Sequence, residues 1–314
     1  MKPSRALLAL AVAACALAAA PAHADPGRGP QYNEYVALGD SWSADVTPIG
    51  IDSTYAPSGC AQSSWNYPKQ VAKAIGVPSF KDATCGSATT VEMTKKQDVN
   101  IIPGLAWGTN DEQFKRLTPT TDLVTIGIGG NDIGLAGALK GCINLLPQLE
   151  LVPGAHLPAP LGGGCKANWV KPDGTDEMSQ RIAKVVPVLR DTFKAIKDRS
   201  PKARVLAVDY LAGAPLNHGC YPYLQVLDDD LQWIGAKLKE LDGAVAQAAK
   251  EADVEFVDTY TGSIGHDVCQ APGVKYVEGI VPLSATPLGL AIPFHPNRLG
   301  ADHQAAAVLE ALKK

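Results

Sequence analysis

The sequence predicts an α/β fold in which helices cover both faces of a mostly parallel sheet of at most five strands. Short runs of β-branched and apolar residues alternate along the chain with longer stretches whose apolar residues recur at helical spacing. Glycine-rich polar turns directly follow two of the apolar runs, as they do at the carboxyl ends of strands in open α/β sheets. No internal repeat or low-complexity linker divides the chain, so one domain is predicted.

The strands are predicted from short runs of Val, Ile, Leu and Ala. In chain order they are 35–38, a weak extended stretch near Phe80, 122–128, 204–209 and 254–257. The runs at 122–128 and 204–209 carry their charged residues at the ends, which is typical of strands buried on both faces.

The helices are predicted from apolar residues three or four positions apart. They cover 67–75, 178–197, 227–252 and 300–313. In the first of them Val71, Ala72 and Ile75 fall on one face, and Ser200-Pro201 ends the second.

Two long stretches show neither the apolar runs typical of buried strands nor the helical spacing of apolar residues. Residues 142–172 are rich in Gly, Pro and Leu, and residues 281–294 are apolar without helical spacing. Long irregular loops in compact domains are usually functional or disordered. We therefore expect 281–294 to be either a loop packed on the core or a wall or lid of an acyl-binding pocket.

The first residues predict export. Lys2 and Arg5 precede an apolar stretch over 6–20, and Ala22-His23-Ala24 is a small-residue cleavage site, so residues 1–24 are predicted to be a signal peptide. A lipoprotein-like box ending at Cys15 is the alternative, but it would leave an unusually short signal segment.

The charge of the remaining chain excludes some partners. Loss of Lys2 and Arg5 reduces the basic residues from 28 to 26 against 32 acidic ones, which takes the formal net charge from −4 to −6. A mildly acidic chain is not typical of nucleic-acid binding and gives no attraction to anionic lipid. No later segment approaches the length that a membrane-spanning helix needs, so no integral membrane segment is expected.

Six cysteines remain once Cys15 is removed with the signal peptide. An even number in an exported chain predicts disulfides, and six cysteines allow 15 pairings. We favour the sequential pairing because each bridge then closes one loop region: Cys60–Cys85, Cys142–Cys165 and Cys220–Cys269. The spacing does not favour a metal site, because there is no C-x-x-C and no pair of histidines at ligand spacing.

Three polar segments can carry chemistry: 39–41 (Gly-Asp-Ser), 129–132 (Gly-Gly-Asn-Asp) and 294–297 (Phe-His-Pro-Asn). The first two follow predicted strands, and the carboxyl ends of parallel strands meet at one edge of a sheet. There Ser41 could attack a carbonyl while His295 takes its proton.

Ester hydrolysis also needs donors for the oxygen that becomes negative, and the neutral amide of Asn131 suits this purpose. His266 is a competing base, although a structural hydrogen-bonding role is the better interpretation. Asp40 and Asp132 are expected to brace the backbone N–H groups of the two turns. Trp42 either borders the pocket or packs beneath the following loop. Each motif alone is common in turns, so their order and placement after strands carry the prediction.

On the residues 39–41, 130–132 and 295–297, the chain resembles the GDSL or SGNH hydrolases, in their secreted bacterial lipase/esterase branch. The segments 82–90 and 265–269 are also similar to this branch. Each motif alone is weak, whereas the ordered set is specific.

The resemblance covers nearly all of 34–314. It implies a three-layer flavodoxin-like SGNH hydrolase fold with about five parallel strands, and its cysteines fall where the branch has three sequential disulfides. By position it implies Ser41 as nucleophile and His295 as base. It also implies an oxyanion hole formed by the Ser41 N–H, Asn131 and one N–H group of residues 86–87.

The chain departs from the family pattern at two positions. The family usually has glycine where this chain has Ser87; we expect the Ser87 N–H to donate, on the condition that its φ is negative, with Gly86 as the alternative. Many members have an aspartate three residues before the histidine, where this chain has Ile292. The carbonyl of Ile292 is therefore expected to accept the Nδ1–H of His295, giving a dyad, with Asp302 as a less favoured carboxylate partner.

The sequence thus predicts a secreted serine esterase or lipase that hydrolyses carboxylic esters through an acyl-enzyme, as one domain over 25–314. We expect it to act as a monomer on a small-molecule or lipid ester, with no cofactor, metal or nucleic acid. Alternatives with the same machinery are a carbohydrate O-acetyl esterase and a phospholipase A. The alternative from another class is a non-catalytic secreted binding protein, which the intact set of Ser41, Asn131 and His295 disfavours.

Overall fold

The computed structural model describes residues 31–99, 108–146, 150–152, 155–156, 160–282, 284 and 290–314. The predicted signal peptide lies outside the described residues, and so does part of the predicted acyl-binding loop at 281–294.

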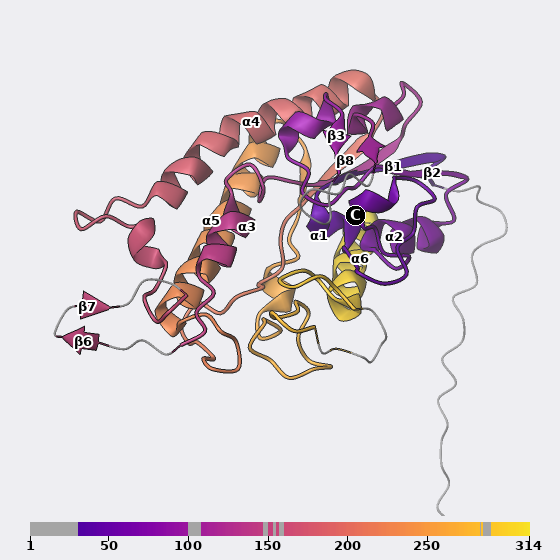
Figure 1. Ribbon diagram of the computed structural model, residues 1–314. Helices are drawn as coiled ribbons and strands as arrows, with labels where there is room; N and C mark the ends of the chain where they lie inside the picture. Colours follow the sequence, from indigo (N-terminus) through magenta and orange to yellow (C-terminus); the bar gives the residue numbers. More distant parts are fainter. Residues whose placement is uncertain are drawn as a thin grey trace, which may run out of the picture.

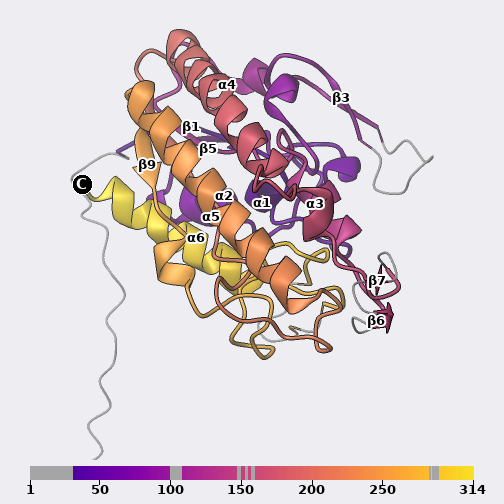
Figure 2. The ribbon, with the colours of Figure 1, turned by 90° about the vertical axis from the view of Figure 1, so that its left-hand side faces the viewer.

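The centre of the molecule is a parallel sheet (Figures 1 and 2). Its five strands have the order β2-β1-β5-β8-β9. Their bounds are Ser79–Asp82 for β2, Glu34–Gly39 for β1, Leu123–Gly127 for β5, Arg204–Val208 for β8 and Glu255–Val257 for β9. The α/β fold with a five-stranded parallel sheet is therefore confirmed. Gly39 of β1 lies opposite Gly127 of β5, so these two strands end side by side at the carboxyl edge.

Six α-helices lie within the described residues. They are α1 (Ser41–Ala44), α2 (Tyr67–Ile75), α3 (Leu135–Gly141), α4 (Glu177–Arg199), α5 (Asp228–Glu251) and α6 (Arg298–Leu312). The four helices predicted from spacing agree with α2, α4, α5 and α6 to within two residues. The sequence did not predict α1 and α3, because α1 is too short to show a period and α3 carries the weak helix formers Gly137 and Gly141.

Helices cover both faces of the sheet, which gives three layers (Figures 1 and 2). Alternate strand residues face opposite helices, as the two-residue period of a strand requires. Val36 and Leu38 belong to the core formed with α4 and α5, whereas Tyr35 and Ala37 belong to the core formed with α2 and α6. All four side chains are fully buried.

Two short antiparallel hairpins lie outside the main sheet. The first pairs β3 (Gln97–Asp98) with β4 (Thr109–Asn110), and the second pairs β6 (Glu150–Val152) with β7 (Ala155–His156). The second hairpin projects away from the sheet (Figures 1 and 2) and lies within the stretch predicted to be irregular. In the part of the chain described, none of the helices has both the length and the apolar character needed to cross a bilayer.

Three disulfides join cysteines that follow one another along the chain: Cys60–Cys85, Cys142–Cys165 and Cys220–Cys269. The six cysteines lie outside the strands of the sheet, although the segments closed by the first and third bridges contain β2 and β9. The sequential pairing is the one favoured on the sequence.

Candidate active site

Ser41 lies where β1 passes into α1, at the carboxyl edge of the sheet. Gly39 in the preceding turn has a φ of +146°, and a Cβ at this position would lie 2.5 Å from Ser43 Oγ. Asp40 caps α1, with its Oδ1 accepting the Trp42 N–H at 2.9 Å. The Gly-Asp-Ser sequence thereby holds Ser41 in one position at the rim.

His295 reaches Ser41 from the loop before α6. Its Nε2 lies 2.8 Å from the Ser41 Oγ, and its Nδ1 lies 2.9 Å from the carbonyl oxygen of Pro293. Because a carbonyl can only accept, Nδ1 carries the proton in this arrangement and Nε2 can accept the Ser41 hydroxyl proton. Burial lowers the pKa of His295 to about 4, so its imidazole is neutral at neutral pH.

The carbonyl that contacts the His295 ring is that of Pro293, and the prediction of Ile292 was wrong by one residue. The Ile292 carbonyl instead accepts the backbone N–H of His295 at 3.1 Å and closes a tight turn, which leaves the Pro293 carbonyl to accept from the ring. Both carbonyls raise the pKa of His295 against the larger effect of burial. Asp302, the less favoured partner, pairs with Arg298 at 2.7 Å.

Phe294 occupies the strained position of this turn. Its φ is +63°, and with Pro293 before it the turn has the signs of a type II turn, which usually has glycine at this position. A positive φ costs a residue with a side chain about 1–2 kcal/mol. Backbone bonds to Glu278 hold the conformation: the Phe294 N–H donates to the Glu278 carbonyl and the Glu278 N–H to the His295 carbonyl, both at 3.0 Å. Glu278 is itself buried and pairs with the buried Lys275 at 3.0 Å.

Asn131 lies in the turn after β5, next to the turn that carries Ser41. The two turns are neighbours because Gly39 and Gly127 end adjacent strands opposite each other. The Asn131 Nδ2 donates to the Ala88 carbonyl at 2.9 Å. An amide nitrogen has two hydrogens, so the second N–H of Asn131 is left to donate to a substrate.

Gly86 and Ser87 lie in a turn just after β2, closed by a bond of 3.2 Å from the Ala88 N–H to the Cys85 carbonyl. The Gly86 N–H already donates to the Cys60 carbonyl at 3.0 Å, whereas among the described residues the Ser87 N–H has no partner. The φ of Ser87 is +64°, and the negative value on which we had based its role is wrong. Ser87 occupies the type II position where the family usually has glycine.

One cavity of about 90 Å³ brings Ser41, Asn131 and His295 together, whereas Gly86 and Ser87 do not line it. The rest of its wall is mainly apolar. A second cavity of about 40 Å³ shares part of that wall: Trp42, Leu135, Leu139, Leu238 and Phe294. Its further lining is also apolar, with Leu231, Ile234, Val268 and Val277 among its residues. The space beside Ser41 therefore suits a hydrocarbon chain.

Tyr210 joins the turns of Ser41 and Asn131, and the sequence analysis missed it. Its hydroxyl donates to Asp40 Oδ2 at 2.6 Å and accepts the Gly130 N–H at 2.8 Å. Burial raises the pKa of Asp40 to about 7, against the lowering effect of this bond. A signal was present, because Tyr210 directly follows a predicted strand and so lies at the same rim.

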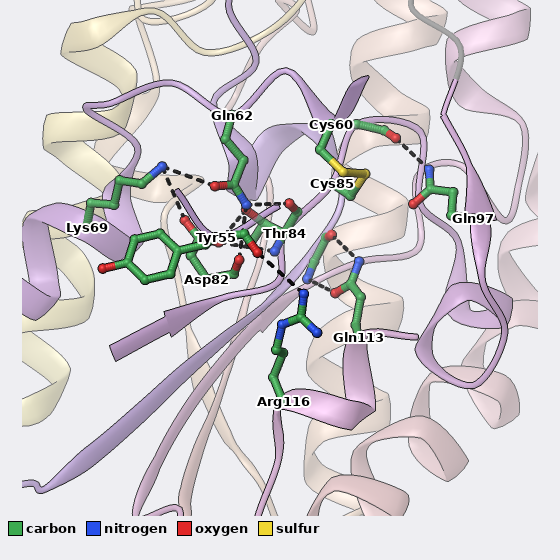
Figure 3. Close-up of a disulfide and its surroundings, with 12 residues drawn as sticks. Tyr55, Cys60, Gln62, Lys69, Asp82, Thr84, Cys85, Gln97, Gln113 and Arg116 are labelled. Carbon is green, nitrogen blue, oxygen red and sulfur yellow. Dashed lines mark hydrogen bonds and ion pairs between the residues drawn. A yellow bond between two sulfur atoms is a disulfide. The ribbon is translucent and has the colours of Figure 1, made fainter. Parts of the chain in front are cut away.

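Gln113 braces the end of β1 close to the Cys60–Cys85 disulfide (Figure 3). Its Oε1 accepts the Gly39 N–H at 2.8 Å and its Nε2 donates to the Gly39 carbonyl at 2.9 Å. The side chain is fully buried. No sequence pattern pointed to Gln113, because it begins a 3₁₀ helix (Gln113–Arg116) too short to show a period, and its partners are backbone groups.

The surroundings of His266 agree with the structural role expected of it, whereas Asp132 bonds to the segment after β2, outside the two turns that it was expected to brace. Asp132 Oδ1 accepts the Thr90 N–H at 3.0 Å and so links the turn after β5 to the segment after β2. The ring of His266 stacks on Tyr276 at a centroid distance of 4.0 Å, with its Nδ1 at the Val274 carbonyl. His266 does not line the cavity of Ser41.

Within the described residues, one group has metal-ligand atoms close together: His218, Asp267 and Cys269, within 4.8 Å of one another. The sulfur of Cys269 is bonded to Cys220. A disulfide sulfur is not the thiolate that a metal requires, so this group does not fit a metal site.

Comparison with known proteins gives a consistent assignment. The model of the GDSL-like lipase/acylhydrolase family matches residues 37–303. The chain is 32% identical over 307 residues to Lipase 2 of Streptomyces coelicolor, covering 97% of this chain and 94% of that protein. It is 26% identical over 332 residues to an esterase of Streptomyces scabiei, covering 98% and 91%.

Two solved structures share the fold. An extracellular lipase from Streptomyces rimosus has a TM-score of 0.62 at 22% identity, covering 89% of this chain and 99% of that chain. A phospholipase A1 from Streptomyces albidoflavus has a TM-score of 0.60 at 21% identity, with the same coverage of 89% and 99%. The family match and the full-length relative together show that this chain belongs to the GDSL-like lipase/acylhydrolase family, which makes it a carboxylic ester hydrolase.

Proposed function

We propose that Ser41 is the nucleophile and His295 the general base of an acyl-transfer reaction on carboxylic esters. The observation that carries the proposal is the 2.8 Å contact between His295 Nε2 and Ser41 Oγ, with Nδ1 on a carbonyl. The Ser41 oxygen attacks the ester carbonyl while its proton passes to Nε2. His295 then returns the proton to the leaving alcohol, which gives the acyl-enzyme. Water then attacks the acyl-enzyme while His295 takes one of its protons. His295 returns this proton to the Ser41 oxygen as the carboxylic acid leaves.

The negative oxygen of the tetrahedral intermediate needs donors. We assign these to the Ser41 N–H, the Ser87 N–H and the side-chain amide of Asn131. Support for Ser87 over Gly86 is that the Gly86 N–H is bonded to the Cys60 carbonyl. Loss of one such donor typically costs about 3–4 kcal/mol of transition-state stabilisation.

The acyl group of the substrate is proposed to be an aliphatic chain. The cavity at Ser41 and its neighbour are both walled by apolar side chains of α3, α5 and the loop before α6. Burying each methylene of a chain against such a wall gains roughly 0.8 kcal/mol. An acetyl group would leave most of this apolar surface unused.

The mature enzyme is proposed to be a secreted monomer. Residues 1–24 have the pattern of a signal peptide, and residues 25–314 would then form a single catalytic domain. Three disulfides are typical of proteins that fold in an oxidising compartment. The mass of the protein recovered from the culture medium, with its free thiols alkylated, checks the cleavage site and the thiol count together.

Labelling with a fluorophosphonate probe tests the nucleophile. The wild-type protein should be labelled once, and Ser41→Ala should lose both labelling and ester hydrolysis while remaining folded. Ser43→Ala is the matched control, because Ser43 is buried two residues away and its hydroxyl donates to the Gly127 carbonyl at 3.2 Å. Labelling that persists in folded Ser41→Ala would contradict the assignment. A wild-type protein that is folded but never labelled would support the non-catalytic binding alternative.

Hydrolysis of nitrophenyl esters of increasing chain length tests the acyl specificity. We expect kcat/KM to rise from acetate to medium chains as methylenes enter the apolar cavities. A sharp preference for acetate would contradict the aliphatic assignment and favour the O-acetyl esterase alternative.

A further inference from the structure

The peptide group between Gly86 and Ser87 has a proposed role for its N–H and a side-chain partner for its carbonyl. Its N–H is the proposed oxyanion donor, and its carbonyl accepts a hydrogen bond from the Nε2 of Gln97 at 2.7 Å (Figure 3). The N–H and C=O of a trans peptide point in opposite directions in one plane. A donor that holds the carbonyl therefore also sets the direction of the Ser87 N–H.

This peptide group has two competing orientations. It is the central peptide of the turn from Cys85 to Ala88, and a rotation of that peptide by about half a turn interconverts type I and type II turns. Type I has a negative φ at the third residue and type II a positive one. Ser87 has a φ of +64°, so the turn is in the type II orientation that disfavours residues with a side chain. The intrinsic preference of serine is thus for the orientation that turns the N–H away.

The other hydrogen bonds of the turn do not fix the orientation of the Gly86–Ser87 peptide. The Gly86 N–H bonds to the Cys60 carbonyl, but it belongs to the peptide between Cys85 and Gly86. The Ala88 carbonyl accepts from Asn131, but it belongs to the peptide between Ala88 and Thr89. Within the described residues, the bond from Gln97 is the side-chain bond that reaches the central peptide. Gln97 is 8% exposed and lies in β3, whose pairing with β4 fixes its backbone.

We infer that Gln97 is a positioning residue that holds the Gly86–Ser87 peptide in the orientation in which the Ser87 N–H faces the developing oxyanion. The inference rests on the proposed function. The gain from a hydrogen bond and the cost of a positive φ at serine are of the same order, so loss of this bond lets the peptide turn over. The Gly86 carbonyl would then face the oxyanion and repel it.

The first test replaces Gln97 by methionine, which is similar in volume but has no N–H donor. We expect Gln97→Met to lower kcat by roughly 10–100-fold with KM changed by less than about threefold, because the oxyanion forms only in the transition state. Gln97→Glu should lower kcat at least as much at pH 8, since a carboxylate cannot donate to the Gly86 carbonyl. It serves as the second variant if the methionine protein does not fold.

A second substitution separates orientation from general damage. Glycine adopts a positive φ freely, so Ser87→Gly removes the preference of serine for the type I orientation of the peptide. Because glycine keeps the backbone N–H, we expect Ser87→Gly to raise kcat by about fivefold or more when it is added to Gln97→Met, relative to Gln97→Met alone. If Gln97 only supported the fold, adding Ser87→Gly would not restore kcat at temperatures at which Gln97→Met and the double variant are both folded.

Gln62→Leu is the matched control. Gln62 is also a buried glutamine beside the Cys60–Cys85 disulfide, and its Nε2 donates to the Thr84 carbonyl at 2.6 Å, upstream of the turn (Figure 3). Its loss should lower the melting temperature and leave kcat within about threefold, because the central peptide is untouched.

The inference is overturned if Gln97→Met keeps kcat within twofold of wild type, if Gln62→Leu loses as much, or if Ser87→Gly restores nothing. These outcomes are distinct from failure of the proposed function. That failure would show as ester hydrolysis persisting in Ser41→Ala, whatever the result at Gln97.

Discussion

The base of this site is an imidazole oriented by a dipole. The Nδ1 of His295 contacts the Pro293 carbonyl, where many family members are expected to have a carboxylate. A carbonyl dipole stabilises imidazolium less than a full negative charge does, so burial dominates and the pKa of His295 is lowered to about 4. The chemical consequence is that the neutral base persists into acidic solution.

The pH dependence of kcat/KM follows from this value. Imidazolium cannot accept the Ser41 proton, so activity should be lost as the pH falls through about 4 and should be nearly complete by pH 6. Rates on a soluble nitrophenyl ester between pH 3.5 and 8 provide the measurement. Asp40, whose pKa is raised by burial to about 7, lines the same cavity; Asp40→Asn should leave the acidic midpoint in place. A midpoint near 6.5 would show that the imidazole is not desolvated.

Among the elements, the site is a set of turns joined by side chains: one at the end of each of β1, β2 and β5, and one in the loop before α6. Two of its turns, at Ser87 and Phe294, keep a positive φ without glycine. Such conformations persist where the surroundings hold them. Tyr210 is one of the side chains that join the turns, because its hydroxyl contacts both Asp40 and the Gly130 N–H.

Tyr210→Phe should weaken the junction of these turns. It leaves a buried carboxylate oxygen and a buried N–H without their partner, which costs roughly 1–3 kcal/mol of stability. It also lets the turns of Ser41 and Asn131 move apart, so we expect kcat to fall by about tenfold or more. Tyr35→Phe is the control, because it removes one buried bond, to Thr125 Oγ1 at 2.7 Å, away from the rim. Equal losses of kcat in the two variants would contradict a role for the junction.

At the scale of the whole molecule, the described part of the chain buries several carboxyl groups, and burial raises their pKa above the usual value: Asp40, Asp45, Asp82, Asp132, Asp209 and Asp242. For Asp40 and Asp209 the value is about 7. The native state therefore binds more protons than the unfolded state between about pH 4 and 7. Their contribution to stability is complete below pH 4 and is lost as the pH rises through 7.

The melting temperature should accordingly fall between pH 5 and pH 8. His295 and His303, whose pKa burial lowers, act in the opposite direction below about 6.5, so the fall should be steepest above that pH. Asp209→Asn removes one of the titrating groups and should make the melting temperature less dependent on pH, whatever its effect on the absolute value. Thermal unfolding followed by circular dichroism measures both slopes. A wild-type melting temperature that rises from pH 6.5 to 8 would contradict the prediction.

The local patterns of the chain determined much of the fold. Strands such as 204–209 could be recognised because burial on both faces gives a continuous apolar run. Helices such as 178–197 could be recognised because burial of one face gives a helical period. α3 could not be recognised, because its glycines weaken the helical pattern. Tertiary packing, through residues that also form part of the cavity wall, stabilises this helix in place of intrinsic propensity. The candidate residues Ser41, Asn131 and His295 could be named because each lies in a motif, and the structure brings them into one cavity.

Only the tertiary structure decided which groups support those residues. How turns from distant segments meet determines three features of the site. These are the contact of the His295 ring with the Pro293 carbonyl in place of that of Ile292, the positive φ of Ser87, and the hydrogen bonds of Tyr210 and Gln97. Most of these contacts have a backbone carbonyl or N–H group as one partner. Nearly every residue has these groups, so the contacts leave no mark on residue type. The sequence by itself determined the chemistry-bearing side chains and the layered sheet, because both depend on the identity and spacing of side chains.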